Sequence, residues 1–304
     1  MAKILVTGGA GFIGSHIVEN FHETDEVIVL DNLRSGFKKN IEPFNVKFVH
    51  GSVTDALLVK KITKGVDYIF HLAALVSVPE SMAAAPLTVS INVNGTLNLL
   101  EAAREHGVKK IVLSSSAAIY GDNPVVPKVE TMLPEPKSPY AITKLDGEYY
   151  FKMYSEEFGV PTVCLRYFNV FGPRQDPNSQ YAAAVPIFID RALKNKDIII
   201  YGDGEQTRDF IFVKDIVKAN AFVAQNPEAN GVYNVARGGR ITINELAKKI
   251  ISITGSKSSI RYAAERAGDV KHSQADVSRL RSLGISPDFD LEEGLKATIE
   301  FFSR

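Results

Sequence analysis

A chain of 304 residues with 35 Lys and Arg against 35 Asp and Glu has no net charge to attract a nucleic acid or an anionic membrane, and it can bury a large core in one or two domains. The chain opens directly into a strand pattern, so we expect no signal peptide, and no apolar run is long enough to span a bilayer. The single cysteine, Cys164, excludes an intrachain disulfide and fits a reducing compartment, so we expect a cytoplasmic protein. From the balanced charge and the short apolar runs we expect no nucleic-acid or membrane partner.

The stretch from Lys3 to Ser15 predicts a strand, a glycine turn and a helix in succession. Its apolar run 4–6 is typical of a buried parallel strand, and helical periodicity begins at Ile13. Between the two lie three glycines at a spacing of three residues, Gly8, Gly11 and Gly14. This arrangement brings bare backbone N–H groups and a helix N-terminus close to a pyrophosphate, so it predicts a dinucleotide site.

A carboxylate follows the second predicted strand. The strand covers 27–30 and ends in Asp31, close to the roughly 20-residue offset expected of a ribose-binding acid. Such a carboxylate accepts from both adenosine hydroxyls and repels a 2′-phosphate, which favours NAD over NADP. The alternative is an Asp that only caps a turn. Arg34 would favour NADP, but beside Lys38 and Lys39 it is interpreted as solvated surface.

Strands and helices alternate over the first part of the chain. Strands are predicted at 46–50, 68–72, 110–114 and 161–166, and long helices at 86–106 and 139–158. Pro86 lies at the start of the first of these helices and Gly107 just past its end, as expected of helix termini. This alternation predicts an α/β fold with a doubly wound parallel sheet, which we assign to residues 1–170.

The pattern changes near Val170, where a proline-rich loop begins. Strands are predicted at 198–201, 210–213 and 232–234, and helices at 183–193, up to 225, from Thr242 onward, and ending near 283 and 302. We assign 171–304 to a smaller α/β substrate domain and expect a strand such as 210–213 to return to an edge of the first sheet. The site is expected where the two domains meet, at the carboxyl ends of the strands.

Two groups of polar residues lie where the first sheet should face a nicotinamide. Tyr140 and Lys144 share one face of a helix, and three serines, Ser114 to Ser116, follow the apolar strand 111–113. A free tyrosine has a pKa of about 10, and we expect the neighbouring ammonium and a positively charged nicotinamide to lower that pKa into the range useful for a base. For the Tyr–Lys pair alone, the alternative is a surface contact between residues i and i+4.

Ordered motifs run through nearly the whole chain. They are Thr-Gly-Gly-Ala-Gly-Phe-Ile-Gly from Thr7, His-Leu-Ala-Ala from His71, Asn-Val-Asn-Gly-Thr from Asn92, Ser-Ser-Ser-Ala-Ala-Ile-Tyr-Gly from Ser114, Ser-Pro-Tyr-Ala-Ile-Thr-Lys from Ser138, Arg-Tyr-Phe-Asn-Val-Phe-Gly-Pro from Arg166, Gly-Asp-Gly-Glu-Gln-Thr-Arg-Asp-Phe from Gly202 and Arg-Ala-Gly-Asp from Arg266. With them the chain resembles the extended short-chain dehydrogenase/reductase family, and within it the UDP-hexose 4-epimerases. The resemblance implies a NAD-binding Rossmann fold and a UDP-sugar substrate.

The resemblance also implies roles for individual residues. Ser116 would be the catalytic hydroxyl, Tyr140 the base and Lys144 the ligand of the nicotinamide ribose. The positions expected to contact NAD are Gly8, Gly11, Phe12, Ile13, Gly14, Asp31, Asn32, Ser35, Gly36, Ser52, Val53, Leu72, Ala73, Ala74, Asn92, Ser114, Tyr140, Lys144 and Tyr167. The positions expected to contact the UDP-sugar are Ser116, Tyr140, Asn169, Ala183, Val185, Tyr201, Arg208, Arg266, Asp269 and Ser273. No metal ion is expected.

Five of these positions would hold the UDP group. Asn169, Arg208 and Arg266 would contact the diphosphate, which guanidinium groups bind bidentately. Asp269 would bind the uridine ribose, and Tyr201 would flank the uracil. For either arginine alone, the alternative is a surface ion pair.

The implied reaction is a reversible redox cycle on bound NAD. Tyr140 removes the proton from the sugar 4-hydroxyl while the C4 hydride passes to NAD⁺. The 4-keto sugar then swings about its diphosphate linkage, and the hydride returns to the other face. Because the cofactor is regenerated in each turnover, we expect it to stay bound.

Departures from the family pattern bear on the substrate. Ala117 and Ala118 stand where related dehydratases carry an Asp-Glu pair and decarboxylases a Glu, so the acid and base for those reactions are missing. Ser273 replaces a bulky Tyr of some epimerases and Ala183 replaces an Asn of others, which favours N-acetylated UDP-hexosamines as well as the plain UDP-hexoses. Ser52-Val53 replaces an Asp that usually contacts adenine.

The predicted helices 86–106 and 139–158 resemble the pair that dimerises relatives as a four-helix bundle, so we expect a homodimer. The apolar residues Val89, Val93 and Leu97 are equally explained by packing on their own sheet. Rival functions are a 4-epimerase of UDP-glucuronate, a net oxidoreductase on another nucleotide sugar, and a non-catalytic NAD sensor. The intact Ser, Tyr and Lys speak against the sensor.

Overall fold

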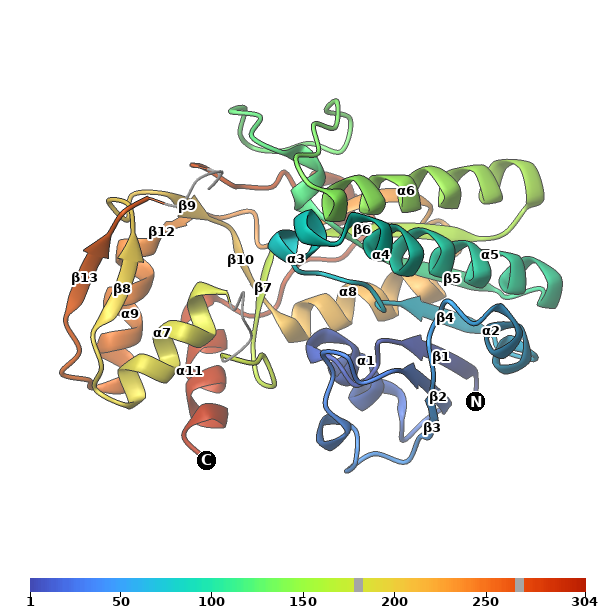
Figure 1. Cartoon of the computed structure of the whole chain (residues 1–304), viewed down its shortest axis with the longest axis horizontal. Helices are drawn as coiled ribbons and strands as arrows, with labels where there is room; N and C mark the ends of the chain where they lie inside the picture. Colours follow the sequence, from blue (N-terminus) through green and yellow to red (C-terminus); the bar gives the residue numbers. More distant parts are fainter. Residues whose placement is uncertain (178–182, 266–270) are drawn as a thin grey trace. The chain divides into compact units, whose positions relative to one another are not determined.

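The computed structural model describes residues 1–177, 183–265 and 271–304. The chain forms two compact units, each built from several segments (Figure 1). Unit 1 comprises residues 1–121, 133–167 and 217–233, and unit 2 comprises 122–132, 168–216 and 234–304. Within the described parts of the chain, no helix is long and apolar enough to cross a membrane.

Unit 1 is organised around a seven-stranded sheet in the order β11-β6-β5-β4-β1-β2-β3. The strands are β1 (Lys3–Thr7), β2 (Glu26–Asp31), β3 (Lys47–His50), β4 (Tyr68–His71), β5 (Lys110–Ser116), β6 (Thr162–Tyr167) and β11 (Gly231–Val235). Neighbours from β3 to β6 pair in parallel. The predicted parallel sheet of a Rossmann-type α/β fold is therefore confirmed.

The main helices that flank this sheet are α1 (Phe12–Phe21), α2 (Ala56–Thr63), α5 (Gly95–His106) and α6 (Pro139–Phe158). Figure 1 shows α5 and α6 side by side. Gly107 and Gly159 follow the ends of α5 and α6 with φ of +64° and +66°, which glycine adopts without strain. The two long helices thus end where the sequence predicts.

The predicted long helix over 86–106 is present, but it contains a π-helical turn that the sequence did not indicate. The structure divides this stretch into α4 (Ala85–Val89), a π-helical turn (Ser90–Asn94) and α5, and a short α3 (Val78–Ala83) precedes them. A π-turn is wider than an α-turn and changes the direction of the side chains on it. Here it carries Asn92, which is 4% exposed.

The core fixes the strand ends. Leu5, Ile69 and Ile111 on adjacent strands are fully buried together with Leu99 of α5 and Phe151 of α6. Burying a side chain of this size is worth roughly 1.5–3 kcal/mol. The core therefore holds the carboxyl ends of β1, β4 and β5 in place beside one another.

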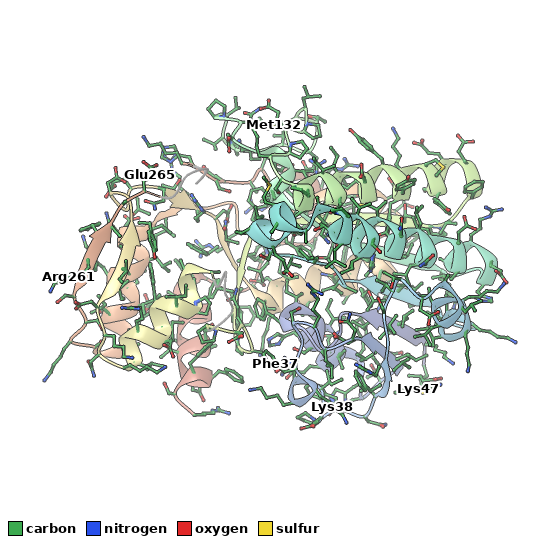
Figure 2. The ribbon with its side chains drawn as sticks, viewed as in Figure 1. Phe37, Lys38, Lys47, Met132, Arg261 and Glu265 are labelled. Atoms are coloured by element: carbon green, nitrogen blue, oxygen red, sulfur yellow. The ribbon has the colours of Figure 1, made fainter. Side chains whose placement is uncertain are left out.

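Unit 2 pairs its described strands two by two. β7 (Asn169–Phe171) pairs in parallel with β10 (Phe210–Phe212), β8 (Ile198–Tyr201) in parallel with β13 (Ile260–Ala263), and β9 (Thr207–Arg208) antiparallel with β12 (Ile241–Thr242). Its helices include α7 (Ala184–Leu193), α9 (Ile243–Thr254), α10 (Ser278–Ser282) and α11 (Leu291–Phe302). Figure 2 shows the side chains of Arg261 on β13 and of Glu265 just beyond it.

A later segment does return to the first sheet, as expected, but it is not the strand at 210–213. β10 pairs with β7, and β11 forms the edge of the seven-stranded sheet beside β6. α8 (Val213–Gln225) leads towards β11, and the buried Lys110 ammonium on β5 donates to the carbonyls of Asn226 and Ala229 at 2.8 and 2.7 Å. Both segments are short and apolar, so their sequences alone do not decide which one joins the sheet.

Candidate active site

The glycine turn after β1 packs too closely for any side chain. Gly8 has a φ of +69°, and a Cβ on it would lie 2.7 Å from the backbone nitrogen of Ala73. A Cβ on Gly14 would lie 2.2 Å from the carbonyl oxygen of Gly8. Gly11 is the N-cap of α1, whose first turn has neither a side-chain cap nor an acidic residue. The backbone N–H groups at this helix start are thus available to an anionic group.

The first turn of α1 holds two further predicted contacts, Phe12 and Ile13, and both are partly exposed. Gly36 in the loop after β2 lies against the glycine turn, because a Cβ on it would be 2.8 Å from the carbonyl carbon of Ala10. Ser35 beside it is exposed, as are Phe37 and Lys38 (Figure 2). The glycine turn and this loop therefore form one surface at the end of β1 and β2.

Asp31 stands at the carboxyl end of β2, with 8% of its surface exposed. Its carboxylate accepts from the backbone N–H of Ala10 at 3.0 Å and of Leu33 at 2.8 Å. These contacts hold the carboxylate beside the glycine turn, where the sequence predicts the adenosine ribose.

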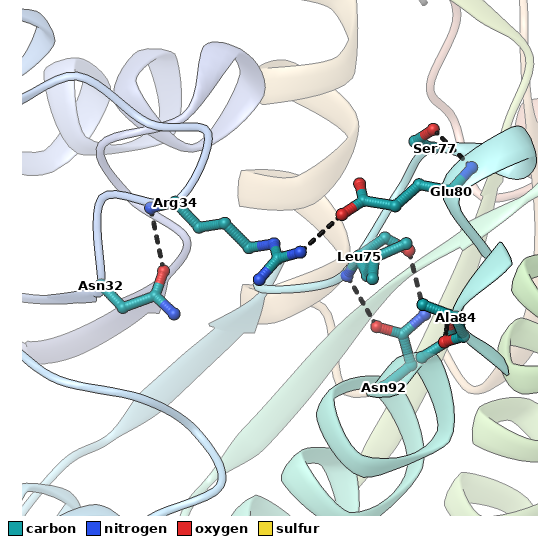
Figure 3. A network of polar contacts seen from close by, with 8 residues as sticks. Asn32, Arg34, Leu75, Ser77, Glu80, Ala84 and Asn92 are labelled. Atoms are coloured by element: carbon teal, nitrogen blue, oxygen red, sulfur yellow. Dashed lines mark hydrogen bonds and ion pairs between the residues drawn. The ribbon is translucent and has the colours of Figure 1, made fainter. Parts of the chain in front are cut away.

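Arg34 is exposed, as predicted, and forms a surface ion pair. Its backbone N–H donates to the side chain of Asn32, and its guanidinium pairs with Glu80 of α3 (Figure 3). Ser77, the N-cap of α3, accepts from the backbone N–H of Glu80 at 3.1 Å. The positive charge that would suit a 2′-phosphate is thus paired with a carboxylate.

The small residues after β4 also lie close to the glycine turn. The N–H of Leu72 donates to the carbonyl of Thr7 at 3.1 Å, and the N–H of Ala73 to its hydroxyl at 3.3 Å. Ala74 follows them and is partly exposed. The backbone of this segment is therefore fixed against β1.

The predicted adenine and nicotinamide contacts differ in how far they are buried. Val53 is buried and packs against Gly95, whereas Ser52 is partly exposed and bonds to Thr54. Asn92 accepts from the N–H of Leu75 at 2.7 Å and donates to the Leu75 carbonyl at 3.1 Å (Figure 3). Its amide also donates to the hydroxyl of Thr143 at 2.9 Å. Asn92 thus fastens the segment after β4 to α6.

The predicted catalytic residues come together at the end of β5. Ser138 caps α6 by accepting from the N–H of Ala141, which starts the helix just before Tyr140. The hydroxyl of Ser116 lies close enough to the Tyr140 phenol to favour its ionised form. The Lys144 ammonium donates to the carbonyl of Ser114 at 2.6 Å and lies 5.9 Å from the centre of the Tyr140 ring. A hydroxyl, a phenol and an ammonium therefore share one corner of unit 1.

Burial dominates the protonation of this corner. It lowers the pKa of Lys144 to about 8, because the charged ammonium loses its hydration. Burial also raises the pKa of Tyr140, and the nearby Ser116 hydroxyl opposes that rise only in part. The expected lowering of the Tyr140 pKa counts on a charged nicotinamide as well as on Lys144, and the chain alone does not produce it.

Sequence reasoning missed the buried partners of these residues. Glu148 of α6 accepts from the hydroxyl of Ser115 and from the guanidinium of Arg166. His71 at the end of β4 bonds to the hydroxyls of Thr7 and Thr96, and burial lowers its pKa to about 3. Glu148 lies one turn beyond Lys144, and this i,i+4 spacing was the available signal.

Tyr167 closes this corner from β6. It is 7% exposed, and its hydroxyl bonds to the side chain of Asn220 on α8. Burial raises the pKa of Tyr167 above the usual range, so this phenol stays neutral.

In unit 2, three predicted substrate residues meet around the β9–β10 segment. Asn169 of β7 donates to the carbonyl of Asp209 at 3.2 Å, and the N–H of Ser273 donates to the carbonyl of Thr207 at 3.1 Å. Arg208 lies between these two carbonyls in the chain and is partly exposed. Asn169, Arg208 and Ser273 are therefore neighbours on one small framework.

Asp209 supports that framework from inside, with 1% of its surface exposed. Its carboxylate accepts from the N–H groups of Arg237 and Gly238 at 3.1 Å each and of Ala275 at 3.2 Å. Burial raises the pKa of Asp209 to about 7, against the opposing effect of these N–H groups and of the Arg237 charge. This aspartate joins three separate segments of unit 2, and sequence reasoning did not single it out.

The remaining predicted substrate residues are spread over unit 2. Ala183 is the exposed N-cap of α7, Val185 is buried in its first turn, and Tyr201 ends β8 with 38% of its surface exposed. Arg266 and Asp269 lie outside the described residues.

Residues 4–236 match the family model of the NAD dependent epimerase/dehydratase family. A relative from Methanocaldococcus jannaschii, described as a putative UDP-glucose 4-epimerase, is 42% identical over 301 residues, which cover 98% of this chain and 97% of the relative. The solved UDP-N-acetylglucosamine 4-epimerase of Methanobrevibacter ruminantium, in complex with UDP-N-acetylmuramic acid, is 45% identical with a TM-score of 0.95, over 99% of this chain and 98% of that one.

A third similar protein is the UDP-glucose 4-epimerase of Thermus thermophilus, solved in complex with NAD. It is 37% identical with a TM-score of 0.90, over 99% of this chain and 98% of that one. The side-chain-free turn at Gly8 and Gly14, the open start of α1 and the carboxylate of Asp31 fit such a dinucleotide. The chain thus belongs to the NAD dependent epimerase/dehydratase family, within the extended short-chain dehydrogenases/reductases, and its cofactor is NAD.

Proposed function

We propose that this protein is a 4-epimerase of UDP-hexoses that works through a transient 4-keto sugar. The observation that supports this most directly is the cluster of Ser116, Tyr140 and Lys144 at the end of β5. The similar proteins named as UDP-sugar 4-epimerases, which match this chain over nearly its full length, support the same reaction.

In this proposal Tyr140 takes the proton of the sugar 4-hydroxyl and returns it after the sugar has turned. Ser116 orients the oxygen and shares the proton, and the Lys144 ammonium favours the phenolate. NAD, when bound, supplies the reversible acceptor for the C4 hydride. Since burial raises the Tyr140 pKa in the chain by itself, the phenolate needs the additional positive charge that arises on the oxidised cofactor.

We assign NAD to unit 1 and the UDP group to unit 2. Arg208 and Asn169 would contact the diphosphate, together with Arg266, while Asp269 would bind the ribose and Tyr201 the uracil. Arg208 suits this role because it lies on a short strand braced at both ends by its neighbours Thr207 and Asp209. Its guanidinium donates to the Thr207 carbonyl at 2.9 Å, and a guanidinium held in this way loses less freedom when it binds a diphosphate.

The substrates we propose are UDP-GlcNAc and UDP-GalNAc as well as UDP-Glc and UDP-Gal. The support is the small Ser273, which is held by a backbone hydrogen bond to Thr207, and the small Ala183. We expect Ser273→Tyr to abolish turnover of the acetylated pair and to spare the plain pair. The control is Ser278→Tyr at a nearby exposed position, which should spare both pairs. Equal loss of both pairs in Ser273→Tyr would contradict the role of Ser273.

The decisive experiment incubates the purified protein with UDP-glucose, UDP-GlcNAc and UDP-glucuronate, with no added cofactor, and identifies products by NMR. Formation of the 4-epimer from retained NAD is expected for the first two. Turnover of UDP-glucuronate alone would establish the rival 4-epimerase, and release of NADH in proportion to substrate would establish a net oxidoreductase. Absence of any turnover would leave the NAD sensor.

We also propose a homodimer formed through α4 and α6. These helices pack together and leave large apolar side chains exposed, namely Leu87, Val89, Ile142, Tyr149 and Met153. Large apolar side chains exposed on two packed helices are typical of an interface. Light scattering should give twice the monomer mass, and Tyr149→Asp should lower it whereas Lys152→Asp on the same helix should not. The cytoplasmic location stays a prediction from the sequence.

A further inference from the structure

The segment Ser114–Ser116 is attached to α6 at three points. Tyr140 and Lys144 make two of these contacts, and Glu148 makes the third by accepting from the Ser115 hydroxyl at 2.5 Å. The three helix residues are spaced by four, so they lie on one face of α6. The proposed function uses the first two contacts and leaves the third unexplained.

Glu148 joins two strands at once. It accepts from Nε and Nη2 of Arg166 at 2.9 and 2.7 Å, and Arg166 is the residue paired with Ser115 across β5 and β6. Arg166 also donates to the hydroxyl of Tyr120 at 2.8 Å, in the 3₁₀ turn that follows Ser116. The serine segment is therefore held from α6, from β6 and from the turn behind it.

The buried ion pair between Glu148 and Arg166 is poorly explained by stability alone. The side chains of Glu148 and Arg166 are each 4% exposed, and removing two charges from water costs about as much as their attraction returns. Apolar residues of similar size would often hold the elements equally well. The pair does something that apolar residues would not, because the negative charge of Glu148 acts on Lys144 one turn away and opposes the effect of burial on that ammonium.

We propose that Glu148 is a positioning residue of the active site, an inference that rests on the proposed function. Through Ser115 and Arg166 it fixes the strand end that presents the Ser114 carbonyl and the Ser116 hydroxyl. Its charge keeps Lys144 protonated. Glu148 touches no reacting atom in this assignment, so its effect reaches the substrate only through those neighbours.

The test compares three variants as holoenzymes. Glu148→Gln removes the charge, and we expect kcat at neutral pH to fall about tenfold, with KM for the UDP-sugar unchanged and the alkaline limb of the kcat profile moved to lower pH. Glu148→Asp keeps the charge but cannot reach both partners, so kcat should fall without that shift. Ser115→Ala should lower kcat a few-fold, again without a shift.

Lys110→Met is the control, because it removes buried hydrogen bonds at the other end of β5. It should lower Tm and leave the pH profile of kcat unchanged. Hydrogen exchange by mass spectrometry supplies a readout independent of turnover. The peptide covering 110–120 should exchange faster at its carboxyl end in Glu148→Gln and Ser115→Ala than in Lys110→Met.

The results distinguish a failure of this proposal from a failure of the proposed function. An unshifted profile in Glu148→Gln, or losses of activity that only follow Tm as in Lys110→Met, would overturn the proposal. If Glu148→Gln does not fold, Glu148→Asp and Ser115→Ala decide by exchange and kcat, and wild-type exchange in both would refute the attachment. If the wild type turns over no UDP-sugar, the proposed function fails, while the exchange measurement still decides whether Glu148 holds the serines.

Discussion

Glu148 in unit 1 and Asp209 in unit 2 are buried carboxylates beside predicted site residues, and their hydrogen-bond partners differ in kind. Glu148 in unit 1 meets a guanidinium and a hydroxyl, so a full positive charge faces it. Asp209 in unit 2 accepts backbone N–H groups from three positions, and burial raises its pKa to about 7. In the proposed function, the pairing of Glu148 fixes residues that handle protons, whereas the pairing of Asp209 draws segments together around the substrate-binding Arg208. We therefore expect unit 1 changes to act on kcat and unit 2 changes on KM.

The largest expected effect is on the chemistry of unit 1. Tyr140→Phe removes the proposed base, so kcat should fall by about 10²–10⁴-fold. NAD content, measured from the absorbance of cofactor released on denaturation, should stay near that of the wild type. Loss of NAD in parallel with activity would mean that Tyr140 acts mainly in binding, and the contrast with unit 2 would weaken.

The second prediction concerns the ion pair between Arg166 and Glu148 in unit 1 and is tested by measuring stability. Arg166→Met leaves Glu148 buried without its cation, and we expect the free energy of unfolding to fall by about 3–5 kcal/mol. Urea denaturation measures it. Arg166→Met combined with Glu148→Leu should recover most of that loss but not the activity. If Arg166→Met alone is as stable as the wild type, leaving Glu148 without its cation does not lower the free energy of unfolding, and the prediction is wrong.

The carboxylate of unit 2 should make stability depend on pH. Asp209 has a pKa of 3.8 when unfolded and about 7 when folded, so the folded chain holds more protons between these values. The stability from this group is full below about pH 4 and is lost as pH rises through 7, by roughly 4 kcal/mol at most. The difference in unfolding free energy between wild type and Asp209→Asn should change between pH 5 and pH 8. A constant difference would contradict the raised pKa.

The smallest expected effect is on binding in unit 2. Arg208→Met removes one charged hydrogen-bonding group, worth about 1.5–3 kcal/mol, so KM for the UDP-sugar should rise about 10–100-fold with little change in kcat. Steady-state kinetics on UDP-glucose measure both constants. A fall in kcat with unchanged KM would place Arg208 with the chemistry and end the division between the units.

The sequence allowed prediction wherever a function depends on local spacing. The glycine triplet spans the turn after β1 and the start of α1, Asp31 ends the next strand, and Tyr140 and Lys144 lie one turn apart on α6, so these spacings can be recognised along the chain. Their positions in the structure agree with those expectations.

What sequence reasoning missed depends on partners far apart in the chain. Arg166 and Ser115 become neighbours only when β5 and β6 pair, and Asp209 gathers residues 237, 238 and 275. The direction of the Tyr140 pKa follows from burial, which no spacing reveals. The π-turn over Ser90–Asn94 interrupts a helix whose apolar period looks continuous.

The place of β11 in the sheet has a consequence for how the nascent chain matures. β6 lies next to β11, which is supplied by residues 231–235, more than sixty positions later. Until the ribosome has released residues 231–235, the edge of β6 is unpaired, and unpaired strand edges promote aggregation of incomplete chains. A fragment stopped at residue 170 would keep that edge exposed and would lack the acceptors for the Lys110 ammonium. We therefore expect a fragment of residues 1–170, expressed by itself, to be insoluble.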